Sequence, residues 1–427
     1  MPPIVYDGLR LLLAAFIRTP RGIDRVDFGY AKFLMENWPV DCFGLLPTPW
    51  GIRLYDRATF LRLLATIQAA WREQQDSDAD PAFADLRSWL AGHPADKQHI
   101  SGRRRPGLAG RGLRYLQDKN LRLGQSAIRK APRNAVYLNV GQVGWAAPLT
   151  TLWLKRRPDI QSIFMLHDVI PLQHANLVSN GGRMSHDWML RTVLSRAAGL
   201  ITTTLSASDT VMETLRQNGL PTVPLRALPL PVADVFLRGD PPDDELRGKP
   251  YFVVCGAIEA RKNHLLLLKV WRRMVQRVGA GAPRLVLVGS PGHLGGQIVR
   301  QFQDAPELKS HVAVVSGLAS PSLCKLMANA RAVLMPSFAE GFGLPVIEAL
   351  TVGTPVLASD IPAHREAGGE FASYLNPSDD IAWFDAIMDL SDNGDETTAL
   401  RSAIAGYRPF TSKDYFVSVA AFLAGFG

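Results

Sequence analysis

The order of apolar runs along the chain is the feature that most constrains its fold. Short apolar runs that suit buried strands alternate with helical patterns, and this alternation favours an α/β fold with largely parallel sheets. In the first half we expect strands at Ile4–Tyr6, Cys42–Leu46, Ala135–Leu138, Ser162–Leu166 and Gly199–Thr203. Helices are expected between them, at Asp24–Glu36, Trp145–Arg157, Ser185–Ala197 and Ser206–Asn218.

A polar, proline-containing stretch at residues 239–250 predicts a linker, after which the alternation restarts. The chain has 427 residues, enough for two domains of about 200 residues each. We therefore expect two α/β units, residues 1–238 and 251–410, followed by a C-terminal segment, 411–427, that packs back on the first unit. Residues 51–130 depart from the alternation, and we expect an insertion in the first unit there.

In the second unit, the expected elements are shorter and closely spaced. Strands are expected at Tyr251–Cys255, Arg284–Val288, Val312–Val315, Ala332–Met335 and Pro355–Ala358. Helices are expected at His264–Val278, Gly295–Gln303, Pro321–Ala328 and Pro345–Thr351.

The segment Glu340–Glu348, with the sequence EGFGLPVIE, carries the clearest functional signal. It follows a short apolar run, and Pro345 suits the first turn of a helix. A helix that starts directly after a strand offers free backbone N–H groups and the positive end of its dipole to an anion. Carboxylates beside it can accept hydrogen bonds from hydroxyls, so the segment predicts a ligand with both phosphate and sugar groups. A capping glutamate plus a surface glutamate is the simpler alternative.

This segment resembles the E-x7-E motif of retaining glycosyltransferases with the GT-B fold, glycosyltransferase family 4. The resemblance spans most of the chain and is strongest from Tyr251 to Glu366. It implies two facing Rossmann-like domains with a cleft between them, with the acceptor on the first and the nucleotide-sugar on the second. It also implies that Glu340 contacts the transferred sugar and Glu348 the ribose. The implied donor site further contains Gly341, Phe342, Gly343 and Leu344.

A second motif follows the first strand of the second unit, at Gly256–Asn263. Arg261 and Lys262 stand at the carboxyl end of that strand, where open α/β sheets bind ligands, and both suit phosphate. The stretch resembles the family's Gly-x-Leu-Glu-Pro-Arg-Lys-Asn variant, which implies that these cations and Gly256 bind the donor diphosphate. Some family members carry an arginine where this chain has Ala257. A charge pair at a helix start is the alternative.

The first unit holds weaker matches. His167 ends an apolar strand and resembles the histidine of the family's His-Asp-x-x-Pro segment, which implies contact with the transferred sugar. Gly22 matches one glycine of the family's phosphate-facing loop, while Arg21 replaces its partner glycine. Arg18, Arg21 and Arg25 are candidates for phosphate or acceptor contacts, with a solvated surface as the alternative.

Two polar turns complete the predicted site. Asn139 and Gln142 lie on a strand-to-helix turn and suit acceptor hydroxyls, although turn residues also satisfy nearby backbone groups. Ser316, Gly317 and Leu318 follow a strand of the second unit, and the resemblance implies that this turn lies beside the nucleobase.

The cluster Asp76–Asp80 has the spacing of a metal-binding loop, but its other positions disagree. Pro81 replaces the glycine of an EF-hand, and Arg87 stands where that loop has its glutamate. We expect a solvated acidic turn there, no metal and no other cofactor. In GT-B enzymes cations and helix amides stabilise the leaving diphosphate instead.

The net charge of +8 is concentrated in one stretch, residues 101–130, which contains nine Arg or Lys residues interleaved with leucines. Such a stretch suits an anionic membrane surface, and a solvated basic hairpin is an equal alternative. No nucleic-acid motif is recognised. The sequence has no apolar run of about 18 residues, and its three cysteines are widely spaced. These features predict a cytoplasmic protein, with peripheral binding to the inner face of the plasma membrane as one alternative.

Together these features predict a retaining, metal-independent hexosyl- or deoxyhexosyltransferase. Its donor would be a GDP-, UDP- or dTDP-sugar, and its acceptor a glycan or a polyprenyl-diphosphate-linked glycan in bacterial surface polysaccharide synthesis. Two alternatives stay open: a catalytically impaired subunit that binds nucleotide-sugars, and a sugar-nucleotide epimerase of GT-B-like fold.

Overall fold

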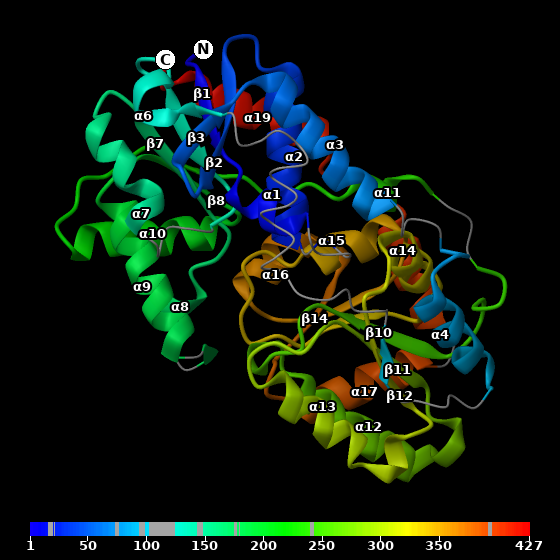
Figure 1. Ribbon diagram of the computed structural model, residues 1–427. Helices are drawn as coiled ribbons and strands as arrows, with labels where there is room; N and C mark the ends of the chain where they lie inside the picture. Colours follow the sequence, from blue (N-terminus) through cyan, green and yellow to red (C-terminus); the bar gives the residue numbers. More distant parts are fainter. Residues whose placement is uncertain are drawn as a thin grey trace.

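The computed structural model describes residues 1–15, 20, 22–72, 77–93, 99–101, 124–142, 148–174, 177–178, 180–239, 243–391 and 395–427. These residues form two α/β domains, each built on its own sheet (Figure 1). The predicted α/β class is therefore confirmed.

The first sheet has the strand order β5-β3-β2-β1-β6-β7-β8-β9. Its pairings are parallel except at β3, which runs antiparallel to both β2 and β5. Apolar runs such as β1 and β6 are buried along their whole length, as in parallel sheets with helices on both faces. The strands are β1 (Ile4–Asp7), β2 (Cys42–Thr48), β3 (Gly51–Tyr55), β5 (Gln125–Ser126), β6 (Val136–Asn139), β7 (Gln161–Leu166), β8 (Ala197–Thr202) and β9 (Leu225–Ala227).

The helices of the first domain connect these strands. They are α1 (Leu9–Ala14), α2 (Gly22–Asn37), α3 (Arg57–Arg72), α6 (Ala127–Lys130), α7 (Pro148–Thr151), α8 (Ile170–Gln173), α9 (Asn180–Leu194) and α10 (Leu205–Gln217). The helix expected at 145–157 is instead the short α7 followed by a 3-10 turn at Leu152–Arg156, while residues 143–147 lie outside the described part.

The second sheet has the strand order β15-β14-β13-β10-β11-β12-β4, and its neighbouring strands run parallel. Its strands from the second half of the chain are β10 (Tyr251–Cys255), β11 (Arg284–Val288), β12 (Val312–Ser316), β13 (Val333–Met335), β14 (Val356–Ser359) and β15 (Ser373–Leu375). The helices are α11 (Asp234–Leu237), α12 (His264–Val278), α13 (Gly295–Gln303), α14 (Ser320–Asn329), α15 (Leu344–Thr351), α16 (Pro362–Gly368), α17 (Asp380–Ser391) and α18 (Asp395–Ile404).

The insertion expected at 51–130 is divided between the two domains, which corrects its assignment to the first. Strands β3 and β5 extend the first sheet. By contrast, β4 (His99–Ser101) pairs with β12 and forms the edge of the second sheet. Helix α4 (Pro81–Ala91) packs there too, and the Leu90 carbonyl accepts a 2.7 Å hydrogen bond from Arg284. Position in the sequence did not reveal this exchange, because residues 77–93 and 99–101 lie in the chain between β3 and β5, which both belong to the first sheet.

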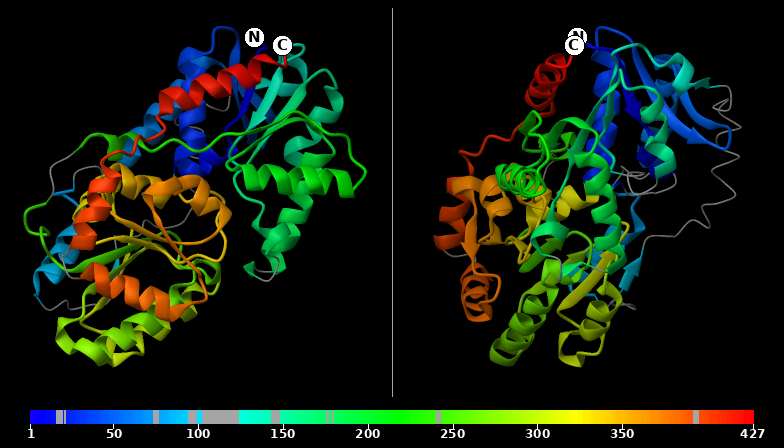
Figure 2. Two further views of the ribbon diagram at one scale, coloured as in Figure 1. Left: turned by 180° about the vertical axis from the view of Figure 1, so that it is seen from behind. Right: turned by 90° about the vertical axis from the view of Figure 1, so that its left-hand side faces the viewer.

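The C-terminal helix α19 (Ser412–Ala424) lies across the first domain (Figure 2). The hydroxyls of Tyr415 and Tyr30 are 2.7 Å apart, and the rings of Phe416 and Phe33 stack with centroids 4.5 Å apart. The C-terminal segment approaches β8 closely, since a Cβ on Gly199 would lie 2.4 Å from the Phe426 ring. The chain thus starts and ends in the first domain.

The two domains contact each other through polar groups as well as apolar ones. The Glu366 carboxylate of α16 accepts hydrogen bonds from the backbone N–H groups of Leu205 and Ser206, at 2.6 and 3.0 Å. These groups lie in the first turn of α10, where free N–H groups and the dipole favour an anion. Glu366 therefore caps a helix of the opposite domain.

Candidate functional site

Glu340 lies at the centre of a compact charged cluster in the second domain. Its Oε2 accepts a 2.8 Å hydrogen bond from Arg261 Nη1, and its Oε1 accepts one of 2.7 Å from Ser337 Oγ and pairs with Lys262 Nζ. Burial raises the pKa of Glu340, but Lys262 and Arg261 outweigh it and hold the pKa well below its usual range. Glu340 is therefore a carboxylate at neutral pH, with a cation on each oxygen.

The backbone around Arg261 and Lys262 explains why both cations reach this carboxylate. They lie on a 3-10 turn, Ala260–Lys262, in the loop that follows β10. Gly256 has a φ of +136°, and a Cβ there would lie 3.1 Å from Lys262 Nζ. A glycine at the strand end thus leaves room for the lysine side chain.

The glycine turn after Glu340 meets the first domain. A Cβ on Gly341 would lie 2.2 Å from the His167 carbonyl oxygen, so only a glycine fits. Thr203 Oγ1 lies 2.8 Å from the Gly341 carbonyl and 3.1 Å from that of His167. Gly343, with a φ of +106°, then starts α15. The turn therefore brings Glu340 and the His167 segment together, although they belong to different domains.

His167 lies directly after β7 and is buried. Its Nε2 is 2.8 Å from the Val140 carbonyl, which only accepts hydrogen bonds, so this nitrogen carries the ring proton. Burial lowers the pKa of His167 to about 4. The imidazole is therefore neutral at pH 7.

Glu348 of α15 pairs across the domain boundary with Arg25 of α2. Arg25 Nη1 lies 3.0 Å from Glu348 Oε1, and Arg25 Nη2 donates a 3.0 Å hydrogen bond to Ser320 Oγ. Burial raises the pKa of Glu348, while the Arg25 charge acts to lower it. Gly22, one turn earlier, lies against Leu344, since a Cβ there would be 2.7 Å from Leu344 Cδ1. Arg25 was expected among acceptor contacts, but it lies against two residues of the second domain.

The other predicted residues of the first domain are less informative. Asn139 Nδ2 donates to the Tyr137 hydroxyl at 3.2 Å, and its Oδ1 accepts from the Gln142 N–H at 3.1 Å. Its amide therefore satisfies groups of its own turn, as the alternative interpretation expected. Gln142 has a φ of +56°, and its buried Nε2 has no hydrogen-bond partner among the described residues. Arg18 and Arg21 lie outside the described residues.

The predicted base-side turn, Ser316–Leu318, joins β12 to α14. Gly317 has a φ of +78°, which favours glycine, and Leu318 is buried. The hydroxyls of Ser337, Thr203 and Ser320 were not predicted. Ser337 follows Pro336 and lies only three residues before its partner Glu340, so the local sequence could have indicated it. The other two hydroxyls depend on contacts with distant residues that no local pattern reveals.

Asp80 corrects the expectation of a solvated acidic turn. It is buried, its carboxylate accepts several hydrogen bonds, and Asp78 pairs with Lys325 at 3.6 Å. Asp76 lies outside the described residues. Within the described part of the chain, no three His, Cys, Asp or Glu side chains are grouped to hold a metal ion. No described helix is both long and apolar enough to cross a membrane. Residues 102–123 of the basic stretch are not described.

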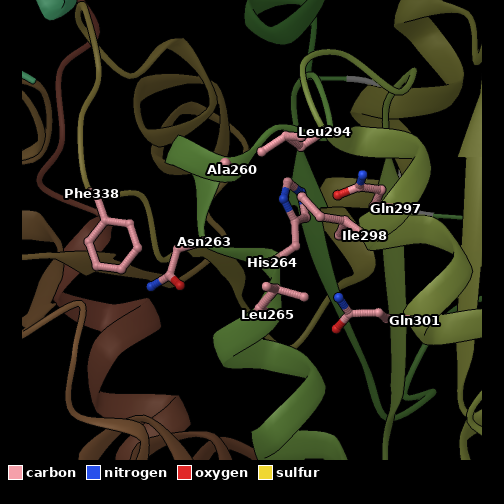
Figure 3. A pocket seen from close by; sticks show the side chains of 9 residues that line it. All are labelled: Ala260, Asn263, His264, Leu265, Leu294, Gln297, Ile298, Gln301 and Phe338. Carbon is pink, nitrogen blue, oxygen red and sulfur yellow. The ribbon is translucent and has the colours of Figure 1, made fainter. Parts of the chain in front are cut away.

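A cavity of about 160 Å³ lies beside the Arg261 loop, where α12 and α13 begin (Figure 3). Its wall consists of Ala260, Asn263, His264, Leu265, Leu294, Gln297, Ile298, Gln301 and Phe338. Burial lowers the pKa of His264 to about 4, so this imidazole is also neutral. The cavity wall contains none of the predicted site residues, so the cavity is not part of the charged cluster.

The second domain matches a known family model. Residues 249–393 match the family described as Glycosyl transferases group 1. The chain is 28% identical over 232 residues to the serotype-specific mannosyltransferase WbdA of Escherichia coli, covering 51% of this chain and 28% of WbdA. It is 31% identical over 157 residues to the O-antigen chain mannosyltransferase RfbU of Salmonella typhimurium, covering 37% of this chain and 43% of RfbU. The matched stretches span less than half of these relatives.

Solved structures resemble the whole chain. The HepE protein of Anabaena, in complex with UDP, aligns over 100% of both chains with a TM-score of 0.59 and 13% identity. Sucrose-phosphate synthase of Thermosynechococcus elongatus aligns over 100% of this chain and 99% of its own, with a TM-score of 0.59 and 16% identity. The predicted fold of two Rossmann-like domains is confirmed by these structures, and the second domain is similar in sequence to group 1 glycosyl transferases.

Proposed function

We propose that this protein is a glycosyltransferase that moves a sugar from a nucleotide-sugar to a glycan acceptor in polysaccharide synthesis. The observation that carries the proposal is the buried cluster of Glu340, Arg261 and Lys262 beside the start of α15 and next to the His167 segment. The match to group 1 glycosyl transferases and the similarity to two O-antigen mannosyltransferases support it.

In this proposal the donor diphosphate binds to Arg261, Lys262 and the positive dipole end of α15. A guanidinium has five N–H donors, so Arg261 can bind an oxygen of the diphosphate while it still donates to Glu340. Glu348 accepts hydrogen bonds from the ribose. The leaving diphosphate is then stabilised by fixed cations and helix amides, which need no reorganisation during the reaction.

We extend the proposal to a retaining reaction. The bond between the sugar C1 and the diphosphate oxygen breaks, and the acceptor hydroxyl forms the new C1–O bond from the same face. The acceptor proton passes to the departing diphosphate oxygen. Glu340 is a poor nucleophile here, because both of its oxygens are engaged by Arg261, Lys262 and Ser337. We therefore assign sugar binding to Glu340, and to the neutral His167 of the other domain.

The relatives suggest which substrates to test first. Because several curated relatives are mannosyltransferases, we propose a hexosyl donor of the mannosyl class, with GDP-, UDP- and dTDP-sugars as the comparison. We further propose a polyprenyl-diphosphate-linked glycan acceptor at the inner face of the plasma membrane. The basic stretch 101–130 supports this location by its charge.

The test has two stages. Thermal shift with GDP, UDP and dTDP should show stabilisation by one of them at concentrations above its dissociation constant. The matching sugar nucleotide should then label a bacterial lipid extract, with the anomeric configuration of the donor kept and with excess EDTA tolerated. No stabilisation by any nucleotide would refute the proposal. Metal-reversible loss in EDTA would refute metal independence.

Two departures from the family's motifs favour one alternative, a subunit that binds nucleotide-sugars without transfer. They are Arg21, which stands where the phosphate-facing loop has a glycine, and Ala257, which stands where some members have an arginine. Nucleotide binding without labelling of any acceptor, and without release of free sugar, would support that alternative. Conversion of the sugar nucleotide to an epimer without any acceptor would support the epimerase alternative.

A further inference from the structure

One carboxylate, that of Asp80, caps two helices. Its Oδ1 accepts a 3.1 Å hydrogen bond from the Ala82 N–H at the start of α4. Its Oδ2 accepts from the Ala319 N–H at 2.9 Å and from Ser322 Oγ at 2.8 Å, at the start of α14. Asp80 is 9% exposed and Ser322 is fully buried. These charge-assisted bonds therefore join a segment of the first half of the chain to the second domain.

The second of these helices begins directly after the turn Ser316–Leu318. Ala319, its N-cap residue, has no side chain that could cap the helix, so Asp80 supplies the cap from 239 positions earlier in the chain. The other end of the turn is also fixed by the same segment, because Ser101 of β4 pairs with Ser316 at the end of β12. Asp80 and β4 therefore hold the turn at both of its ends.

A third contact reaches the same region from the first domain. Arg25 donates to Ser320 Oγ and pairs with Glu348, both at 3.0 Å. The start of α14 thus lies between Asp80 and Arg25, next to the carboxylate assigned to the ribose. This side of the site is separated along the sheet from the Arg261–Lys262 turn, because β11 lies between β10 and β12.

We propose that Asp80 is a positioning residue for the base end of the donor site, and that residues 77–93 and 99–101 are a structural part of that site. This inference rests on the proposed function. Removing the carboxylate leaves the Ala319 N–H and the Ser322 hydroxyl buried without their acceptor, so the start of α14 and the turn before it shift. The contacts of the base and the ribose are then weakened, while Arg261 and Lys262 still bind the diphosphate.

The experiment compares two ligands across three variants by titration calorimetry. The ligands are the nucleoside diphosphate that stabilises the wild type and inorganic pyrophosphate, which lacks base and ribose. Asp80→Ala should weaken nucleoside diphosphate binding roughly tenfold or more and leave pyrophosphate binding within about twofold. Asp80→Asn should lie between, since one amide oxygen replaces two carboxylate oxygens. Asp304→Ala is the control, because this exposed carboxylate at the C-terminal end of α13 lies outside the segment that caps α14, and it should change neither affinity.

The outcomes separate this inference from the proposed function. A wild type that binds no nucleoside diphosphate overturns both. A wild type that binds, with a folded Asp80→Ala variant of unchanged affinity, overturns the inference alone. Equal losses for both ligands also overturn it, because they indicate general loss of structure. If Asp80→Ala does not fold, Ser322→Ala removes one of the bonded groups and should give a smaller loss, about threefold, with the same selectivity. An unchanged affinity in Ser322→Ala then overturns the inference.

Discussion

The two sides of the candidate site, to which we assign the donor and the acceptor in our proposal, differ in how their polar groups are used. In the second domain, Arg261, Lys262 and Glu340 come from two loops and converge on one another at a helix start. In the first domain, Asn139 bonds to its own strand and turn, and His167 faces the carbonyl of Val140. The charged groups of the second domain thus converge from two loops on one point, which is where we propose that the diphosphate binds. The polar groups Asn139 and His167 of the first domain are buried and bond to groups of their own domain.

The largest effect should come from the donor side. Lys262→Ala removes a buried cation assigned to the leaving diphosphate, and we expect kcat/KM for sugar transfer to fall by roughly 10²–10³-fold, as when one charge-stabilising group is removed from an active site. Lys269→Ala on the exposed face of α12 is the matched control and should retain activity. Nucleoside binding without phosphate should change little. Transfer at wild-type rate in Lys262→Ala would contradict the donor-side assignment.

In the first domain, the pH dependence of the free energy of unfolding tests whether His167 is buried and neutral. Burial lowers the pKa of His167 from 6.5 to about 4, so the unfolded chain takes up this proton before the folded one. The contribution of neutral His167 to the free energy of unfolding is fully present above pH 6.5. It is lost as the pH falls from 6.5 towards 4, and the loss is on the order of 3 kcal/mol.

Urea denaturation at several pH values measures this loss. His167→Gln should flatten the decline, and His264→Gln is the comparison because its pKa is also about 4. An NMR titration in which the His167 imidazole signal changes near pH 6.5 would contradict the prediction that burial lowers its pKa.

Glu348→Ala tests the ribose assignment on the donor side. The lost hydrogen bond to a charged group is worth roughly 1.5–3 kcal/mol, so the nucleoside diphosphate should bind at least tenfold more weakly. Pyrophosphate should bind as before, because it has no ribose. Unchanged affinity for the nucleoside diphosphate in a folded variant would remove Glu348 from the site.

The Arg25→Ala variant tests whether Arg25 contributes to donor binding or to acceptor binding. Arg25 belongs to the first domain but contacts Glu348 and Ser320 of the second. We expect Arg25→Ala to weaken donor binding by roughly threefold to tenfold, in the range of partly exposed ion pairs, and to leave the KM for the acceptor unchanged. Steady-state kinetics with both substrates varied provide the measurement. A change confined to the acceptor KM would restore the original prediction of an acceptor contact.

The parts that the sequence predicted are those that depend on local pattern. Apolar runs predicted β1, β7 and β10 closely. Two separate local motifs singled out Glu340 and the neighbours Arg261 and Lys262, but the ion pairs that join these motifs were not predicted. The edge strand β4 has three residues, and its place in the second sheet depends on β12, far away in the chain. The same holds for Asp80 and for the pair of Arg25 and Glu348, which are 323 positions apart. Contacts between segments distant in sequence leave no periodicity to recognise.

The smallest expected effect concerns Gln142, the acceptor-side residue whose role is least defined by its contacts. Its φ of +56° is a conformation in which a non-glycine residue is strained, and such strain persists where the surroundings impose it. Gln142→Gly should relieve that strain and raise the free energy of unfolding by about 1 kcal/mol.

Asn134→Gly provides the matched control, since Asn134 has a φ of +55° and is exposed before β6, at the strand end away from the turn of Asn139. Both variants should gain stability in urea denaturation. If the Gln142 side chain binds acceptor hydroxyls, only Gln142→Gly should also raise the acceptor KM, by about threefold for one neutral hydrogen bond. A Gln142→Gly enzyme that gains stability and keeps its acceptor KM would make this residue part of the turn alone, and would leave the acceptor side to His167 and to groups outside the described residues.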